Sequence, residues 1–140
     1  LRRSRGLGDV YKRQPFNLSI DCAQDFLALS PISIVTSGTA SLEAAVLGSV
    51  PIICYKTNKL NYAILSRLLK TPFIGLPNLL LQEHIFPELV QNNLTPNTIV
   101  ESFKKILIDS GQYNSYLSKI NHSMHGEGFE VAANAIKKIL

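Results

Sequence analysis

The stretch that decides the fold is ISIVTSGTASLEAAVLGSVPIICY, residues 32–55. It begins with a β-branched run at 32–36, turns through the small residues at 37–39, and continues as an Ala- and Leu-rich helical segment up to Gly48. Glycine is typical of the residue just past a helix end, and a second apolar run follows at 50–55. Both runs are continuously apolar, as in parallel strands covered on both faces. The stretch therefore predicts a β-α-β unit.

Further helices are predicted on both sides of this unit by the spacing of apolar residues. They cover residues 21–29, 59–70, 96–108, 113–124 and 129–140, and Thr95-Pro96 is predicted as the N-cap and first residue of the third. Asp109-Ser110-Gly111 predicts a break, FIGLPN (73–78) an extended piece that ends at Pro77, and PELVQ (87–91) a short helix. The predicted fold class is α/β, a Rossmann-like parallel sheet with helices on both faces and a helical C-terminal tail. Two or three strands are few for such a sheet, so we expect part of a domain.

The positive charge of the chain is concentrated at its start. The 140 residues carry a formal net charge of +4. Residues 1–14 hold five basic side chains and one acidic one, and residues 15–140 hold nine of each. A neutral body gives no reason to expect a nucleic-acid partner. Residues 4–14, SRGLGDVYKRQ, match the translation of a transposase adapter used in sequencing libraries, so 1–14 is predicted to be a non-native segment that packs on nothing.

The bulk composition is that of an ordinary globular chain, with 46% hydrophobic and 17% charged residues. No apolar stretch is long enough to span a bilayer, and no secretory signal follows the basic start. Cys22 and Cys54 lie in apolar surroundings, which favours buried free thiols over a disulfide or a metal site. A reducing cytoplasm is the expected compartment.

The turn between the first strand and its helix is the candidate binding site. The N–H groups at a helix N-terminus favour an anion, and Gly38 would let a phosphate approach the backbone. Ser37, Thr39 and Ser41 add hydroxyl groups. Ligands of open α/β sheets bind at this carboxyl edge of the strands. The turn therefore predicts a site for a nucleotide diphosphate.

Glu43 lies about one turn into the same helix. It misses the capping-box position, which is occupied by Leu42. Its carboxylate could accept both hydroxyls of a ribose, or it could only complement the helix dipole, and the pattern leaves both interpretations open. His122 and His125 with Glu127, and the lone His84, are weaker candidates, because no third metal ligand or catalytic partner accompanies them at a known spacing.

Joined to LPNLL (76–80), PELVQ (87–91) and the final GEGFEVAANAIKKIL, the Ser-Gly-Thr-Ala-x-Leu-Glu turn at 37–43 resembles the C-terminal part of bacterial lipid-A-disaccharide synthases. The resemblance covers about residues 21–140. It implies a partial C-terminal UDP-sugar-binding domain, residues 15–140, of a GT-B glycosyltransferase that needs no metal or other cofactor. Gln82-Glu83-His84 departs from the family, which usually has a Gly-Arg-Glu-like segment there, and this puts a phosphate contact at that place in doubt.

The resemblance also implies an activity and a set of binding residues. The family transfers 2,3-diacylglucosamine from UDP to 2,3-diacylglucosamine 1-phosphate, giving the lipid A disaccharide and UDP. Residues carried over by position would contact the donor: Ser37, Gly38 and Thr39 at the pyrophosphate, Glu43 at the ribose, and Tyr55, Lys56 and Asn78 along the donor side. No catalytic residue is assigned, because the proposed general base belongs to the family's N-terminal domain.

The expected partners are therefore the UDP-2,3-diacylglucosamine donor, a lipid acceptor and a second copy in a homodimer, with peripheral contact at the inner face of the inner membrane. The 140 residues alone are expected to have no transferase activity. Two alternatives remain, a sugar-nucleotide epimerase of GT-B architecture and a non-enzymatic nucleotide-binding module.

Overall fold

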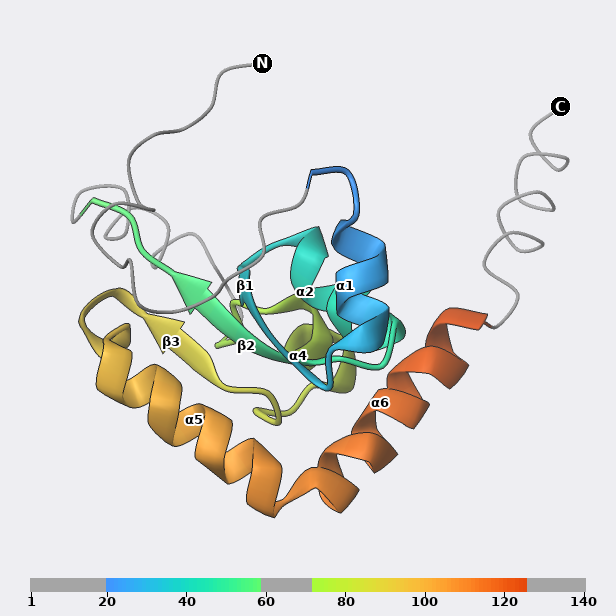
Figure 1. Cartoon of the computed structure of the whole chain (residues 1–140). Coiled ribbons are helices and arrows are strands. Elements are labelled where there is room, and N and C mark those ends of the chain that lie inside the picture. The colour runs from blue at the N-terminus through green and yellow to red at the C-terminus, as the bar shows by residue number, and fades with distance from the viewer. Residues whose placement is uncertain (1–19, 59–71, 126–140) are drawn as a thin grey trace, which may run out of the picture.

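The computed structural model describes residues 20–58 and 72–125. The predictions for residues 1–14, for a helix at 59–70 and for a helix at 129–140 lie outside this part of the chain. The described part contains a three-stranded sheet surrounded by helices (Figure 1). The strands are β1 (Ile32–Thr36), β2 (Val50–Tyr55) and β3 (Glu88–Val90), in the order β1-β2-β3. Both pairings are parallel, so the predicted α/β class is confirmed.

The predicted β-α-β unit is present. Helix α2 (Thr39–Val46) joins β1 to β2 and contacts both strands. It ends where predicted, because Gly48 adopts φ 90° just past the C-cap Leu47. Ile52 and Ile53 are neighbours on β2 and therefore point to opposite faces, yet each is no more than 1% exposed. Both faces of the central strand are thus covered, as the apolar run predicts.

The remaining helices frame this unit. Helix α1 (Ala23–Leu29) precedes β1, and α4 (Leu76–Leu81) precedes β3. The short 3-10 helix η1 (Gln91–Asn93) leads from β3 to α5 (Pro96–Ile108) and α6 (Ser110–His125). In Figure 1, α2 and α4 lie beside each other, and α5 and α6 form a V, in which α6 packs against α2 and α4. The core joins side chains from α2, β2, α5 and α6, including Ile52, Ile106 and Ile120.

Helix α5 begins where the sequence predicts. Thr95 is the N-cap: its hydroxyl accepts from the backbone N–H of Thr98 at 3.2 Å, and the Thr98 hydroxyl accepts from the backbone N–H of Thr95 at 3.1 Å. Pro96 occupies the first helical position, where its missing N–H costs nothing. Each threonine hydroxyl thus accepts a hydrogen bond from the other residue's backbone N–H, and the pair fixes the start of the helix.

Three sequence predictions are wrong. PELVQ (87–91) is not a helix: residues 88–90 form β3, because pairing with β2 outweighs the weak helical signal of three residues. The extended piece predicted at FIGLPN (73–78) ends early: Gly75 is still extended, but helix α4 begins at Leu76, and Pro77 stands in its first turn rather than ending an element. The break predicted at 109–111 is limited to Asp109. Its carbonyl accepts from the N–H groups of Gln112 and Tyr113, and helix α6 therefore begins at Ser110.

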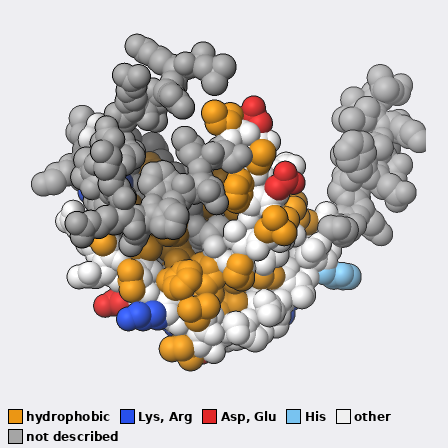
Figure 2. All heavy atoms as spheres, in the orientation of Figure 1, with side chains coloured by type: hydrophobic (Ala, Val, Ile, Leu, Met, Phe, Trp, Pro, Cys, Tyr) orange, Lys and Arg blue, Asp and Glu red, His pale blue; other side chains and the backbone are white. Residues whose placement is uncertain are grey.

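Apolar surface remains uncovered on the described part of the chain. Ile34 of β1 pairs with Ile52 of β2 and lies on the same face of the sheet. Ile34 is 59% exposed, so this face is covered at Ile52 of β2 but not at Ile34 of β1. Figure 2 shows apolar side chains gathered in a patch on the face toward the viewer, with few charged side chains among them. No helix in residues 20–58 and 72–125 is long and apolar enough to cross a membrane.

Candidate functional site

The turn after β1 lies at the carboxyl edge of the sheet, as predicted. The backbone N–H of Ser37 donates to the carbonyl of Cys54 at 3.0 Å, which ties the turn to the end of β2. Tyr55 is the last residue of β2, and the exposed Lys56 follows it. The structure therefore brings Ser37, Gly38, Tyr55 and Lys56 to one edge, where the sequence expects the donor.

The backbone of the turn has free donors. Gly38 is the N-cap of α2, with φ 132° and ψ −159° and no side-chain cap. Among the described residues, no group accepts a hydrogen bond from the N–H groups of Gly38, Thr39 and Ala40. Three N–H groups at the positive end of a helix are suited to hold an anion.

The serine hydroxyls of the turn are engaged inside the protein. Ser37 Oγ donates to the carbonyl oxygen of Ile74 at 2.9 Å, and the buried Ser41 Oγ donates to the carbonyl oxygen of Gly38 at 2.7 Å. The sequence predicts both hydroxyls as donors to a ligand. In this structure only the exposed Thr39 hydroxyl is available for that purpose, and the serines shape the turn.

Glu43 is half-buried on α2 and has a protein partner. Its Oε1 accepts from Nε2 of Gln24 on α1 at 2.9 Å. Side chains on a helix tend to lean toward its N-terminus, which favours a carboxylate on the side of the turn. Oε2 has no partner among the described residues, which leaves one oxygen for a ligand. Gln24 carries no sequence signal, because residues 24 and 43 meet only through the packing of α1 on α2.

Asn78 is fully buried, and its amide is saturated. Nδ2 donates to the carbonyl of Phe86 and to Oε1 of Glu88, each at 2.8 Å. Oδ1 accepts from the backbone N–H groups of Ile85 and Phe86 at 3.1 and 2.9 Å. An amide offers two donors and two acceptor sites, so none remains for a ligand. The place of Asn78 inside the protein suits a structural role, and its direct contact with the donor stays a prediction.

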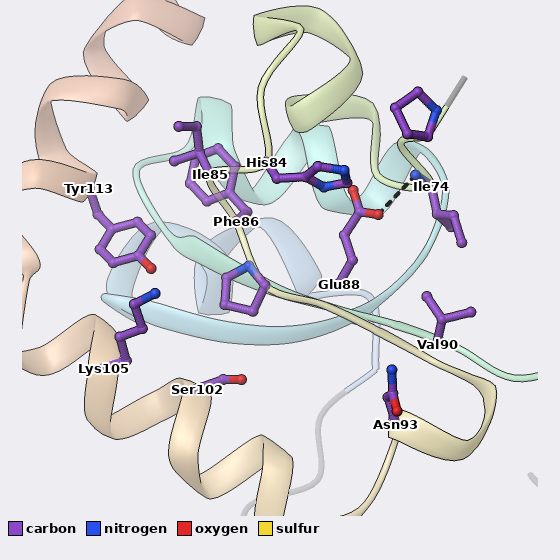
Figure 3. Close-up of a pocket in the computed structure, with 12 residues that line it drawn as sticks. Ile74, His84, Ile85, Phe86, Glu88, Val90, Asn93, Ser102, Lys105 and Tyr113 are labelled. Carbon is purple, nitrogen blue, oxygen red and sulfur yellow. Dashed lines mark hydrogen bonds between the residues drawn. The ribbon is translucent and has the colours of Figure 1, made fainter. Parts of the chain in front are cut away.

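Glu88 is the residue that sequence reasoning misses. Its Oε2 accepts from the N–H of Ile74 at 3.0 Å, a bond drawn in Figure 3. Its Oε1 accepts from the N–H of Gly75 at 3.0 Å and from Asn78. The carboxylate therefore holds the loop before α4 on the start of β3. Only the unexpected strand at 88–90 places it there.

Gly75 is required for space. A Cβ at residue 75 would collide with Cδ1 of Ile53 and would lie 3.2 Å from Oε1 of Glu88. Gly75→Ala is therefore expected to lower the free energy of unfolding by about 1–3 kcal/mol through overpacking. Urea denaturation measures the change, with Gly111→Ala as the control, because a Cβ there meets nothing within 4 Å. Equal stability of the two variants would contradict the crowding at Gly75.

A pocket of about 500 Å³ lies beyond β3, between the loop, α5 and α6 (Figure 3). Ile74 and Glu88 line one side, and Lys105 and Tyr113 line the other. Burial, and then the negative charge of Asp109, raise the pKa of Tyr113, so its phenol stays protonated at neutral pH. His84, one of the weaker candidates, is exposed and lies against Phe73, with ring centroids 4.6 Å apart and ring planes inclined by 55°.

Among the described residues, no group of three or more His, Cys, Asp or Glu side chains is placed to hold a metal ion. Glu127 and the side chain of His125 lie outside the described part. Cys22 and Cys54 are free, as predicted, but half-buried rather than buried. Burial raises the pKa of the Cys54 thiol, which keeps it protonated and unreactive.

Comparison with known proteins decides the family. The family model described as lipid-A-disaccharide synthetase matches residues 12–139. The chain belongs to the lipid-A-disaccharide synthetase family. A lipid-A-disaccharide synthase of Dechloromonas aromatica is 33% identical over 138 residues, which is 94% of this chain and 36% of that protein. Lipid-A-disaccharide synthase 2 of Legionella pneumophila is 36% identical over 120 residues, covering 84% of this chain and 31% of that protein.

The matches also bear on the alternatives. A lipid-A-disaccharide synthase of Cellvibrio japonicus is 44% identical over 85 residues, or 61% of this chain. The chain thus spans about a third of the length of the lipid-A-disaccharide synthases that it matches most fully. These relatives share one name, so the epimerase and the non-enzymatic nucleotide-binding module find no support.

Proposed function

We propose that residues 15–140 contribute part of the UDP-sugar-binding domain of a glycosyltransferase. Its reaction would transfer 2,3-diacylglucosamine from UDP to 2,3-diacylglucosamine 1-phosphate, giving the lipid A disaccharide and UDP. The family assignment supports the reaction class. The observation that carries the binding role is the turn at 37–40, where the N–H groups of Gly38, Thr39 and Ala40 have no acceptor among the described residues.

The turn would act on the leaving group. As the bond between the sugar and UDP breaks, negative charge develops on the β-phosphate. Backbone N–H groups that are already oriented stabilise such charge without reorganising, and the positive end of α2 adds to their effect. The serine hydroxyls keep the turn in shape, and Thr39 supplies one further donor. This arrangement accounts for charge stabilisation with residues of the chain alone.

The other proposed contacts surround the turn. Glu43 would accept the ribose hydroxyls with its unpartnered oxygen, while Gln24 holds the other. Tyr55 and Lys56 would line the donor side at the end of β2. Ser37 and Asn78 would act indirectly, because their side chains are engaged in the protein. We also propose that the complete enzyme works as a homodimer at the inner face of the inner membrane, where its lipid acceptor is found.

The ribose contact gives the test. We expect the chain to bind UDP and to prefer it to 2′-deoxy-UDP, because a hydrogen bond to a charged carboxylate contributes about 1.5–3 kcal/mol. Glu43→Ala should weaken UDP binding about tenfold or more and remove that preference. Isothermal titration calorimetry with both nucleotides measures the two effects.

The control for this test is Glu101→Gln, on the exposed side of α5, which should bind as the wild-type chain does. If Glu43→Ala keeps the full preference for UDP, then Glu43 only complements the helix dipole. If the wild-type chain does not bind UDP, the proposed binding role of the turn is wrong.

A further inference from the structure

We propose that Glu88 is a positioning residue for the turn at 37–39 and acts through the peptide unit that joins Ile74 to Gly75. This inference rests on the proposed function, in which the turn binds the pyrophosphate of UDP. Glu88 itself touches no ligand in this proposal. It sets the place of a backbone group to which Ser37 is bound.

The two contacts meet on one peptide unit. The N–H of Gly75 donates to Oε1 of Glu88 at 3.0 Å, and the carbonyl of Ile74 accepts from Oγ of Ser37 at 2.9 Å. These N–H and C=O groups belong to the same planar amide, and in a trans peptide they point in opposite directions. Glu88 and Ser37 therefore bind the two polar groups of one peptide unit, on its opposite sides.

The charge of Glu88 strengthens this arrangement. Its carboxylate accepts from three N–H donors, those of Ile74, Gly75 and Asn78, at 2.8–3.0 Å. Among the described residues, no lysine or arginine pairs with it. A charge-assisted bond to the N–H of an amide polarises the whole amide, which makes its carbonyl a better acceptor. The negative charge of Glu88 thus strengthens the hydrogen bond from the Ser37 hydroxyl to the Ile74 carbonyl.

Ser37 connects the Ile74–Gly75 peptide unit to the turn. Its hydroxyl is bound to Ile74, and its N–H is bound to the carbonyl of Cys54, so the residue is fixed at two points. Gly38 follows directly and opens α2, whose first N–H groups have no acceptor in residues 20–58 and 72–125. A tilt of the peptide at 74–75 would move Ser37, and the direction of those N–H groups would change with it.

The fold brings Glu88 within reach by two features. Parallel pairing sets Glu88 beside Ile53 on the neighbouring strand β2. The missing side chain of Gly75 lets the loop pass over Ile53 and approach the carboxylate. Neither feature involves the turn directly, so Glu88 would not be found by looking for residues near a ligand.

A double-mutant cycle on UDP affinity tests the proposal. Glu88→Gln keeps the size of the side chain but replaces an acceptor with an NH2 group that faces a backbone N–H. We expect Glu88→Gln and Ser37→Ala each to weaken UDP binding about tenfold, and the double variant to be weakened hardly more than either. A residue that only supports the fold would give independent, additive losses. Glu101→Gln, combined with Ser37→Ala in the same way, is the matched control.

The outcomes separate this inference from the function on which it rests. If the wild-type chain binds UDP and Glu88→Gln binds it equally well, or if the losses are additive, Glu88 has no positioning role. Absence of UDP binding by the wild-type chain overturns the proposed function and this inference together.

A second measurement needs no variant. In NMR spectra of the labelled wild-type chain, UDP should shift the amide signal of Gly75 and the side-chain carboxyl signal of Glu88, and leave the carboxyl signal of Glu101 in place. UDP binding without a shift at Gly75 and Glu88 would overturn the coupling, even if Glu88→Gln fails to fold.

Discussion

Replacing Asn78 with aspartate is expected to lower the free energy of unfolding by about 3–5 kcal/mol. The change removes both Nδ2 donors, which bind the carbonyl of Phe86 and Oε1 of Glu88. It also places a second carboxylate at hydrogen-bond distance from Glu88 in a fully buried position. Losing a buried partner leaves the other group without compensation, and two like charges in contact add repulsion.

Urea denaturation followed by circular dichroism measures this loss. Asn114→Asp is the matched control, because Asn114 is exposed on α6 and the same substitution there should change stability by less than about 0.5 kcal/mol. A domain stabilised by about 5–15 kcal/mol would lose a large part of its stability through Asn78→Asp. Similar stabilities of the two variants would show that the amide of Asn78 does not organise the loop.

Gly38→Ala is expected to abolish most UDP binding while the chain still folds. Gly38 has φ 132° and ψ −159°, a conformation that essentially only glycine adopts, so an alanine there costs about 1–3 kcal/mol. A Cβ would meet nothing within 4 Å, so the cost lies in the backbone and not in a collision. The backbone can relieve the strain only by rotating, which turns the free N–H groups away from the phosphates.

Gly48→Ala provides the control at the other end of the same helix. Gly48 also has a positive φ, 90°, and open space around its Cα. Both variants should lose a similar amount of stability, and only Gly38→Ala should lose UDP affinity, by more than tenfold in calorimetric titrations. Equal affinities of the two variants would mean that the turn does not bind the nucleotide.

Most of the fold can be predicted from the sequence where the signals are local. The β-branched runs, the Ala- and Leu-rich helix and Gly48 define β1, α2 and β2, and the structure has all three. Thr95 and Pro96 mark the start of α5 to the residue. Each of these signals comes from the conformational preference of the residue itself, so no distant contact is needed to interpret it.

Strand β3 and the side-chain contacts of the site could not be predicted from local sequence signals. Three residues at 88–90 carry too little pattern to be told from a helical turn, and they become a strand because β2 offers them an edge. The position of the turn at 37–39 is predictable, since it lies inside the β-α-β unit. The partners of its side chains are not, because Ser37 and Ile74, like Glu43 and Gln24, are far apart in the chain.

The sequence by itself therefore determines the chemistry that the turn can offer: a glycine at its centre, small residues around it and an acidic residue one helical turn later. Those properties follow from residue types at short spacing. Only the tertiary structure decides which polar groups are left for a ligand. The hydroxyl of Ser37 and the amide of Asn78 are both consumed by neighbours, and Glu88 gains its place through β3. Burial makes an unpaired polar group costly, so most buried polar groups take a partner, and the fold alone selects that partner.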